Sequence, residues 1–184
     1  MASDLIRSPA KLLREVSVAP VHDFGKITTP LEILRKVSYL TRKEREILKD
    51  HAATGFVLLS YYLGGEDRLS PKVAHEHHER RDGSGYPRGI KLADRMVELV
   101  AVCDVFDALI SPRPYRDVPY DTRSALELIC EDASLGKLSR SIVKLLVSYN
   151  RRDKTFCRNL VISKEKRGAP SKGSRYGMVV DDPD

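Results

Sequence analysis

The chain has 184 residues, of which 41% are hydrophobic and 32% are charged. This length predicts a single folded domain, and the composition excludes a wholly disordered chain. No apolar run approaches the roughly 20 residues that cross a bilayer, and the amino terminus lacks the basic-then-apolar pattern of a secretory signal. Three cysteines far apart in the sequence suit reduced thiols better than a disulfide framework. We therefore expect a cytoplasmic protein with no membrane span.

The net charge of +6 is concentrated near the carboxyl end. Residues 151–184 hold nine Lys or Arg against five Asp or Glu, so most of the excess lies there. A solvated tail is the simplest interpretation, and the alternatives are contact with a phosphate backbone or docking to a partner protein. The charge by itself does not predict a nucleic-acid-binding protein.

The first half of the chain predicts a short amphipathic stretch and two helices. Residues 10–16 form a short amphipathic stretch, and residues 31–37 form a short helix behind Pro30. Thr41 and Glu44 have the spacing of a capping box, in which each side chain caps a backbone N–H of the other. The capping box predicts a long helix that carries His51 on its apolar face and ends at Gly64–Gly65.

The second half predicts four more helices. Ser70 with Pro71 begins a helix that carries His77 and His78, and a glycine-rich loop follows at residues 83–89. The remaining helices are expected at about residues 94–110, after Asp121 and after Ser139.

No segment shows the alternating pattern of a strand next to turn signals. The sequence therefore predicts an all-α bundle of five to six helices with a loop-like basic tail. We expect an amino-terminal segment at residues 1–20, a helical domain at 21–150 and the tail at 151–184.

Four of the five histidines lie beside residue types that a hydrolytic metal site needs: His22, His51, His77 and His78. Imidazole and carboxylate side by side, as in His22-Asp23, can both ligate a divalent cation, and the carboxylate can bridge two. Adjacent residues on a helix diverge by about 100°, so His77 and His78 can share a site only at a helix end or between two metals. Asp104 interrupts an apolar stripe, where a carboxylate is costly unless it is paired or metal-bound.

Each of these residues also has an ordinary structural interpretation. His22-Asp23 is compatible with a simple turn, and His51 with a hydrogen-bonded core histidine. Asp104 is compatible with a salt bridge to Arg95 or Arg113.

Three cations are candidates for contact with a phosphate. Lys26 follows the His-Asp pair by about one turn and could stabilise phosphate charge or donate a proton to a leaving oxygen. Arg113 and Arg116 offer forked donors that match phosphate oxygens, although a surface turn with solvated arginines is the alternative.

Taken together, these residues resemble the HD-GYP subgroup of the HD phosphohydrolase superfamily over about residues 20–150. The resemblance rests on an ordered set of motifs: His22-Asp23-x-Gly25-Lys26, Leu40-Thr41-x-x-Glu44, His51-x-x-x-Gly55, the run from His77 to Pro87, residues 104–109, and Arg113-Pro114-Tyr115-Arg116. The run from His77 to Pro87 is highly specific, and the complete order is more so.

The resemblance implies a helical bundle that holds two or three iron or manganese ions and hydrolyses cyclic di-GMP. By position, the implied metal ligands are His22, Asp23, His51, His77, His78 and Asp104. Lys26 would act at the phosphate with Asp23 in the catalytic site, and Arg113 and Arg116 would hold the phosphodiester backbone. The implied lip over the site, which is also a surface for a signalling partner, comprises Asp82, Gly83, Gly85, Tyr86 and Pro87.

One departure from the family pattern bears on activity. Family members carry a helix before the His-Asp motif with a further His and often a Glu as ligands, whereas here no histidine precedes His22 and Glu15 is the only upstream glutamate. The sequence thus predicts truncated first helices or a divergent member. Two alternatives follow: a catalytically impaired module that binds cyclic di-GMP or a protein, and a hydrolase of another nucleotide phosphate ester.

Overall fold

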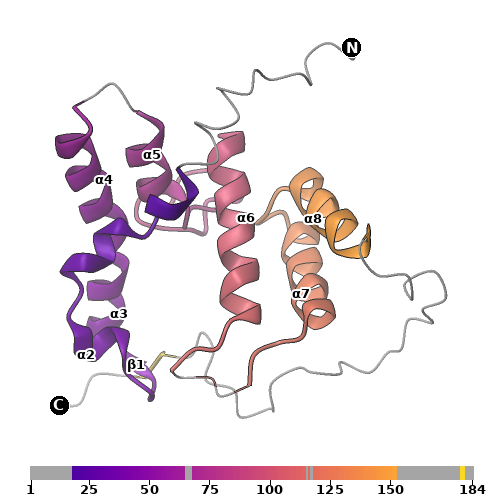
Figure 1. Cartoon of the computed structure of the whole chain (residues 1–184), viewed down its shortest axis with the longest axis horizontal. Helices are drawn as coiled ribbons and strands as arrows, with labels where there is room; N and C mark the ends of the chain where they lie inside the picture. Colours follow the sequence, from indigo (N-terminus) through magenta and orange to yellow (C-terminus); the bar gives the residue numbers. More distant parts are fainter. Residues whose placement is uncertain (1–17, 65–67, 115, 117, 153–178, 181–184) are drawn as a thin grey trace.

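The structure, a computed structural model, describes residues 18–64, 68–114, 116, 118–152 and 179–180 (Figure 1). Within these ranges the α-helices are α2 (Leu31–Leu34), α3 (Arg42–Lys49), α4 (His51–Tyr62), α5 (Leu69–Glu76), α6 (Arg95–Ile110), α7 (Thr122–Ser134) and α8 (Arg140–Arg152). Two 3₁₀-helices, η2 (Ala19–Val21) and η3 (Phe24–Thr28), precede them, and the strands are β1 (Leu40–Thr41) and β2 (Val179–Val180). The predicted all-α bundle is confirmed, while the predicted stretch at residues 10–16 lies outside the described residues.

Helix α6 lies between two groups of helices, with α4 and α5 on one side and α7 and α8 on the other (Figure 1). Each side has its own hydrophobic core. One core contains Val18, Val73, Leu92, Val97, Val100 and Ala101, and the other contains Val102, Leu109, Ala125, Ile129, Ala133, Leu138, Ile142 and Val143. Because α6 contributes to both cores, apolar burial fixes it relative to both groups of helices.

The predicted helix starts follow from capping hydrogen bonds. Thr41 accepts from the backbone N–H of Glu44, and Glu44 accepts from that of Thr41, which completes the capping box. Asp94 accepts from the first turn of α6, and Asp121 does so at the start of α7. These caps satisfy N–H groups that have no partner within the helix.

The predicted long helix is divided into α3 and α4 at Asp50. Next to this join, Nδ1 of His51 lies 2.6 Å from the carbonyl oxygen of Leu48. A side chain that shares a helical carbonyl is a known cause of a bend. The helix predicted at residues 31–37 is also shorter: α2 ends at Leu34, and Val37 beyond it is 64% exposed.

The prediction that His77 and His78 lie on a helix is wrong. Helix α5 begins at Leu69 rather than after Ser70, and it ends at Glu76. Pro71 is thus the third residue of α5, where its missing N–H is still tolerated because the first four N–H groups lack helical acceptors. His77 caps the end of the helix, and His78 lies beyond it.

Two elements lie at the carboxyl-terminal end of the described residues. Helix α8 continues to Arg152, and Val179–Val180, predicted as loop, pair in parallel with Leu40–Thr41. The rest of the basic tail lies outside the described residues. Among the helices that the structure describes, none combines the length and the apolar character needed to cross a membrane.

Candidate metal centre

The His22-Asp23 pair lies between η2 and η3, and a glycine contact holds it against α4. A Cβ atom on Gly25 would lie 1.9 Å from the carbonyl oxygen of His51 and 2.6 Å from the backbone nitrogen of Gly55. Only a residue without a side chain fits this approach. The close contact brings Asp23 next to His51: Oδ1 of Asp23 lies 3.4 Å from Nε2 of His51.

The remaining candidate ligands come from the ends and faces of neighbouring helices. His51 begins α4, His77 and His78 follow α5, and Asp104 lies in the middle of α6. Their potential ligand atoms gather into two groups, and within each group they lie within 4.8 Å of one another. The first group is Asp23, His51, His77 and His78, and the second is His22, Asp23 and Asp104. The structure thus brings all six predicted ligands together, and Asp23 belongs to both groups.

The backbone determines which nitrogen of each imidazole faces the cluster. Nδ1 of His51 lies 2.6 Å from the Leu48 carbonyl oxygen, and Nδ1 of His77 lies 3.0 Å from the carbonyl oxygens of Val73 and Ala74. A carbonyl can only accept, so Nδ1 carries the proton in both rings, and Nε2 presents a lone pair. These two Nε2 atoms lie 3.4 Å apart. Two lone pairs at this distance favour a cation between them.

His22 has the same arrangement on the other side of Asp23. Its Nδ1 lies 2.5 Å from the Ala19 carbonyl oxygen, and its Nε2 lies 3.4 Å from Oδ2 of Asp23 and 3.6 Å from Oδ1 of Asp104. A hydrogen bond from Nδ1–H to a carbonyl is the usual support for a metal-binding histidine, because it fixes the tautomer and the ring orientation.

The three histidines of the first ligand group are neutral at neutral pH. Burial lowers the pKa of His51, and burial together with the charge of His22 lowers the pKa of His77 to about 4. Burial and the neighbouring imidazoles His77 and His51 hold the pKa of His78 well below its ordinary value. Neutral imidazole is the form that ligates metal ions, so these rings need lose no proton to bind one.

His22 and the two carboxylates are charged instead. Burial opposes the charge of His22, but its contacts with Asp104, Asp23 and the Ala19 carbonyl outweigh burial and raise its pKa to about 10. Burial also opposes the charge of both carboxylates. For both Asp23 and Asp104, the contact with His22 outweighs burial and lowers the pKa. The charge of Lys26 lowers the pKa of Asp23 further.

One buried oxygen shows that the residues fit a divalent cation. Among the described residues, Oδ1 of Asp23 is buried and accepts no hydrogen bond, although it faces Nε2 of His51 and, at 3.8 Å, Nε2 of His77. A buried carboxylate oxygen without a donor is costly. A metal ion between this oxygen and the two lone pairs would satisfy all three atoms. The donor set of imidazole and carboxylate suits Fe, Mn or Zn.

Lys26 lies at the edge of the cluster. Its Nζ lies 2.5 Å from Oδ2 of Asp23, and about a third of its side chain is exposed. The ammonium group therefore adjoins the predicted ligands and also faces solvent, where a bound phosphate could reach it.

The predicted lip loop is held to the cluster by Glu79, a residue that the sequence analysis did not single out. The side chain of Glu79 is fully buried, and its carboxylate accepts from the backbone N–H groups of Arg88 at 2.8 Å and Ile90 at 3.1 Å. A Cβ atom on Gly85 would lie 2.4 Å from the Glu79 Cα, so only glycine fits there. Glu79 directly follows two candidate ligands in the sequence, and this position could have identified it. A glutamate buried beside a metal site needs hydrogen-bond partners.

Tyr86 closes one side of the site. Its ring stacks on His78 at 4.5 Å between centroids, and its backbone N–H donates to the His78 carbonyl. Burial raises the pKa of the Tyr86 hydroxyl, which therefore remains a hydrogen-bond donor.

The two predicted phosphate-binding arginines occupy different environments. Arg113 forms a 3.2 Å ion pair with Asp107, whereas the alternative interpretation of the sequence pairs it with Asp104. Arg116 is 3% exposed, and its Nη2 donates to the carbonyls of Ala108, Leu109 and Ser111 at 2.6–3.0 Å. Arg116 thus caps the carboxyl end of α6, whereas Arg113 is the more accessible of the two.

His75, the fifth histidine, lies outside both ligand groups. Its ring stacks on Phe56 with the centroids 4.9 Å apart.

Comparison of the sequence with known proteins identifies a family for this chain. A family model described as HD domain matches residues 3–142. A cyclic di-GMP phosphodiesterase from Thermotoga maritima is 48% identical over 101 residues, which cover 54% of this chain and 27% of that protein. The cyclic di-GMP phosphodiesterase response regulator RpfG from Xanthomonas campestris is 44% identical over the same shares of each chain.

A third relative extends the similarity along the chain. The 3'3'-cGAMP-specific phosphodiesterase 2 from Vibrio cholerae is 33% identical over 147 residues, covering 79% of this chain and 27% of that protein. In each of these three relatives the matched part is about a quarter of the whole length. The family match over most of the chain, together with the similarity to these phosphodiesterases, shows that the chain belongs to the HD domain family and is of the HD-GYP type.

Proposed function

We propose that this chain is a metal-dependent phosphodiesterase domain that hydrolyses cyclic di-GMP. The observation that carries the proposal is the convergence of the Asp23 Oδ1 atom with the Nε2 atoms of His51 and His77, since these three atoms could ligate one divalent cation. The names of the relatives, which are phosphodiesterases of cyclic di-GMP or 3'3'-cGAMP, support the substrate class.

The proposed cofactor is a pair or trio of divalent ions, iron or manganese, held by the six residues of the two ligand groups. When bound, such ions would lower the pKa of an attacking water and draw charge from the phosphoryl oxygens. Asp23 is suited to a bridging position because Oδ1 faces His51 and His77 while Oδ2 faces His22.

The other side chains would orient the substrate. Lys26, beside Oδ2 of Asp23, would offset charge on the phosphate or protonate the leaving oxygen. Arg113 would contact the phosphodiester by exchanging its exposed partner Asp107 for a phosphate oxygen, a modest cost because exposed ion pairs contribute little. The loop with Tyr86 would cover the site and offer a surface to a signalling partner.

The test is turnover by the purified chain reconstituted with Fe²⁺ or Mn²⁺, with cyclic di-GMP and 3'3'-cGAMP as parallel substrates. We expect hydrolysis that is abolished in His77→Ala and Asp23→Ala. His75→Ala is the matched control, because it removes a histidine outside both ligand groups and should retain activity. Folded protein that binds metal but cleaves neither substrate would refute the proposal, and a clear preference for one substrate would settle which dinucleotide it takes.

A second candidate is a module that binds the nucleotide or a protein without cleaving it. It is the alternative expected from the sequence, in which residues 1–21 contain no histidine. Calorimetry would then show nucleotide binding without product, and metal analysis would show fewer than two ions per chain. Two or more ions with turnover would exclude this candidate.

A further inference from the structure

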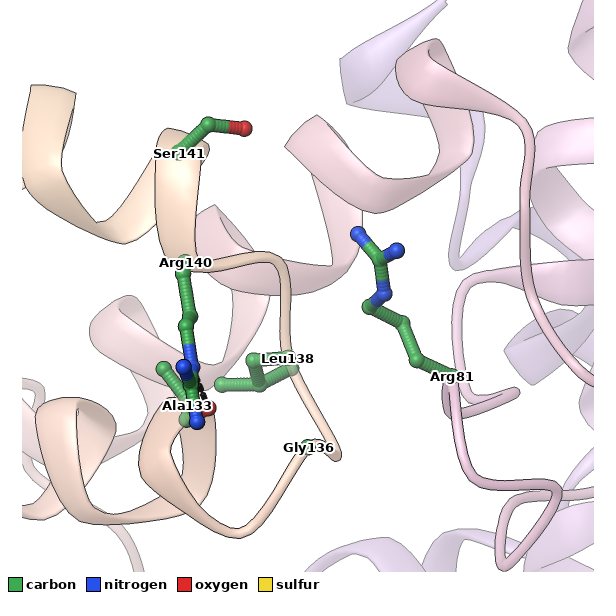
Figure 2. Close-up of a pocket in the computed structure, with 6 residues that line it drawn as sticks. All are labelled: Arg81, Ala133, Gly136, Leu138, Arg140 and Ser141. Atoms are coloured by element: carbon green, nitrogen blue, oxygen red, sulfur yellow. Dashed lines mark hydrogen bonds between the residues drawn. The ribbon is translucent and has the colours of Figure 1, made fainter.

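A pocket of about 370 Å³ lies between the segment that leads into the lip loop and the start of α8, and it shares no residue with the metal centre (Figure 2). Its lining residues are Arg81, Ala133, Gly136, Leu138, Arg140 and Ser141. Arg81 reaches in from the lip side, while Arg140 and Ser141 belong to α8 on the other side (Figure 2). The volume falls within the range of small-molecule sites.

The pocket carries positive charge that is only partly neutralised. Its lining includes two guanidinium groups and no carboxylate. Arg140 donates from Nε to the Ala133 carbonyl and from Nη2 to the Ser134 carbonyl, both at 3.1 Å. Both acceptors are uncharged carbonyls at the carboxyl end of α7, and within the described part of the chain no carboxylate forms an ion pair with Arg140. The helix end offsets only part of the guanidinium charge, so the remainder is available to an anion.

Arg81 is the other guanidinium, and it is held through one nitrogen. Its Nη1 lies 3.0 Å from Oε1 of the buried Glu98 and 3.4 Å from Oγ of Ser139. A guanidinium has five N–H donors, and 47% of this side chain is exposed. Arg81 can thus donate to a ligand from its other nitrogens while it keeps the contact with Glu98.

Hydroxyl groups complete the polar lining. Oγ of Ser141 lies 3.2 Å from Oγ of Ser139, which in turn contacts Arg81. Ser139, Ser141 and Arg81 form a connected set of polar groups. Forked guanidinium donors match the oxygens of a phosphate better than a single point charge does.

We infer that this pocket binds a small phosphate dianion, either inorganic phosphate or the phosphate group of a nucleoside monophosphate. Two arginines against one glutamate leave one net positive charge for the anion. The site is independent of the phosphodiesterase proposed above. A bound anion would join the lip segment to the turn between α7 and α8, where the N–H of Arg81 already donates to the Lys137 carbonyl.

The experiment is a titration of the metal-stripped full chain with inorganic phosphate and, separately, with guanosine monophosphate, followed by backbone amide NMR. Removal of metal prevents phosphate from binding at the metal centre. We expect saturable shifts at the amides of Gly136, Arg140 and Ser141 with either anion, and tighter binding of the nucleotide if its base also contacts the pocket.

Variants at Arg81 distinguish a specific site from general attraction. Glu98→Gln releases Arg81 from its acidic partner and should tighten binding about tenfold, since one ion pair no longer competes with the ligand. Arg81→Gln combined with Glu98→Gln, which avoids an unpaired buried carboxylate, should weaken binding at least about tenfold relative to Glu98→Gln.

Arg123→Gln combined with Glu98→Gln is the charge-matched control, because it removes one cation from the same background as Arg81→Gln does. Arg123 lies ten residues before Ala133 on the same helix, about 15 Å away, and its substitution should leave the affinity of Glu98→Gln unchanged. Equal affinities for the two double variants, or the absence of saturable shifts at the pocket amides, would overturn the inference.

Discussion

The histidines of the metal centre differ in charge although they lie within a few ångströms of one another. His51, His77 and His78 have lowered pKa values because they are buried among other imidazoles, whereas His22 faces Asp104 and Asp23 and has a pKa raised to about 10. At neutral pH the metal-free cluster therefore holds one proton that a metal must displace, and this proton resides on His22.

This difference predicts how metal affinity depends on pH. Because the pKa of His22 in the folded protein lies above its ordinary value of 6.5, His22 stabilises the metal-free fold most fully below about pH 6.5, and this stabilisation is lost as the pH rises through about 10. Metal binding requires the neutral ring, so affinity for Mn²⁺ should rise with pH up to about 10. Calorimetry at pH 8 in buffers of different ionisation enthalpy should show about one proton released for the ion that His22 ligates. The release should disappear in His22→Gln, and an unchanged release in that variant would contradict the assignment.

The two arginines of the Arg-Pro-Tyr-Arg motif are expected to differ in their roles, with Arg116 contributing to stability and Arg113 to substrate binding. Arg116→Met should lower the free energy of unfolding by about 1–3 kcal/mol, because it removes three bonds to carbonyls at the end of α6. Arg113→Met should change stability by less than about 0.5 kcal/mol, because its partner Asp107 is 65% exposed, and should raise KM for the dinucleotide. Urea unfolding and steady-state kinetics check both. A raised KM with unchanged stability in Arg116→Met would show that it binds substrate directly.

At the scale of elements, close contacts between backbones place the ligands. The start of η3 lies against α4 at Gly25 and Gly55, and the end of α5 lies close enough to α4 for Nε2 of His78 to come within 3.2 Å of Nε2 of His51. The sequence motifs include both glycines but do not explain them. Glycine is needed at both positions because segments about 30 residues apart are in contact there, and no local propensity encodes such a contact.

Gly25→Ala should therefore disturb the site more than an ordinary glycine substitution. Its Cβ would overlap the backbone of His51, so we expect a loss of about 3 kcal/mol in unfolding free energy, together with weaker metal binding. Gly64→Ala is the control, because its Cβ would meet no atom within 4 Å and only its φ of +64° opposes the change, at a cost of about 1 kcal/mol. Thermal unfolding and metal titration of both variants test this, and equal effects would mean that the contact at Gly25 does not position the site.

At the scale of the whole molecule, α6 ties the metal centre to two cores. It carries Val97 and Val100 into one core, Val102 and Leu109 into the other, and Asp104 into the metal centre. The ligands of the centre thus come from segments that are brought together only when the helices pack. A metal ion bound to all of them should stabilise the folded chain as a unit.

Metal addition should accordingly raise the unfolding temperature. At a free metal concentration 100 times Kd, the gain is about 2.7 kcal/mol, or roughly 5–10 °C for a domain of this size. Differential scanning calorimetry with and without Mn²⁺ measures it, and a chelator should reverse it. His77→Ala should show little shift, while His75→Ala should behave as the wild type. An equal shift in all three proteins would indicate nonspecific binding.

The sequence by itself determined the helical class, the capped starts of α3 and α7, the approximate start of α6, and the six candidate ligands. These depend on local chemistry: capping hydrogen bonds, apolar periodicity, and histidines and carboxylates in a specific order. Only the tertiary structure decided that α5 ends before His77 and that Asp23 has one oxygen facing each ligand group. It also showed that Glu79 holds the lip loop through hydrogen bonds from the loop backbone. It also decided that Arg116 caps α6 while Arg113 stays accessible, because burial and the partners of a charged side chain are set by segments distant in the sequence.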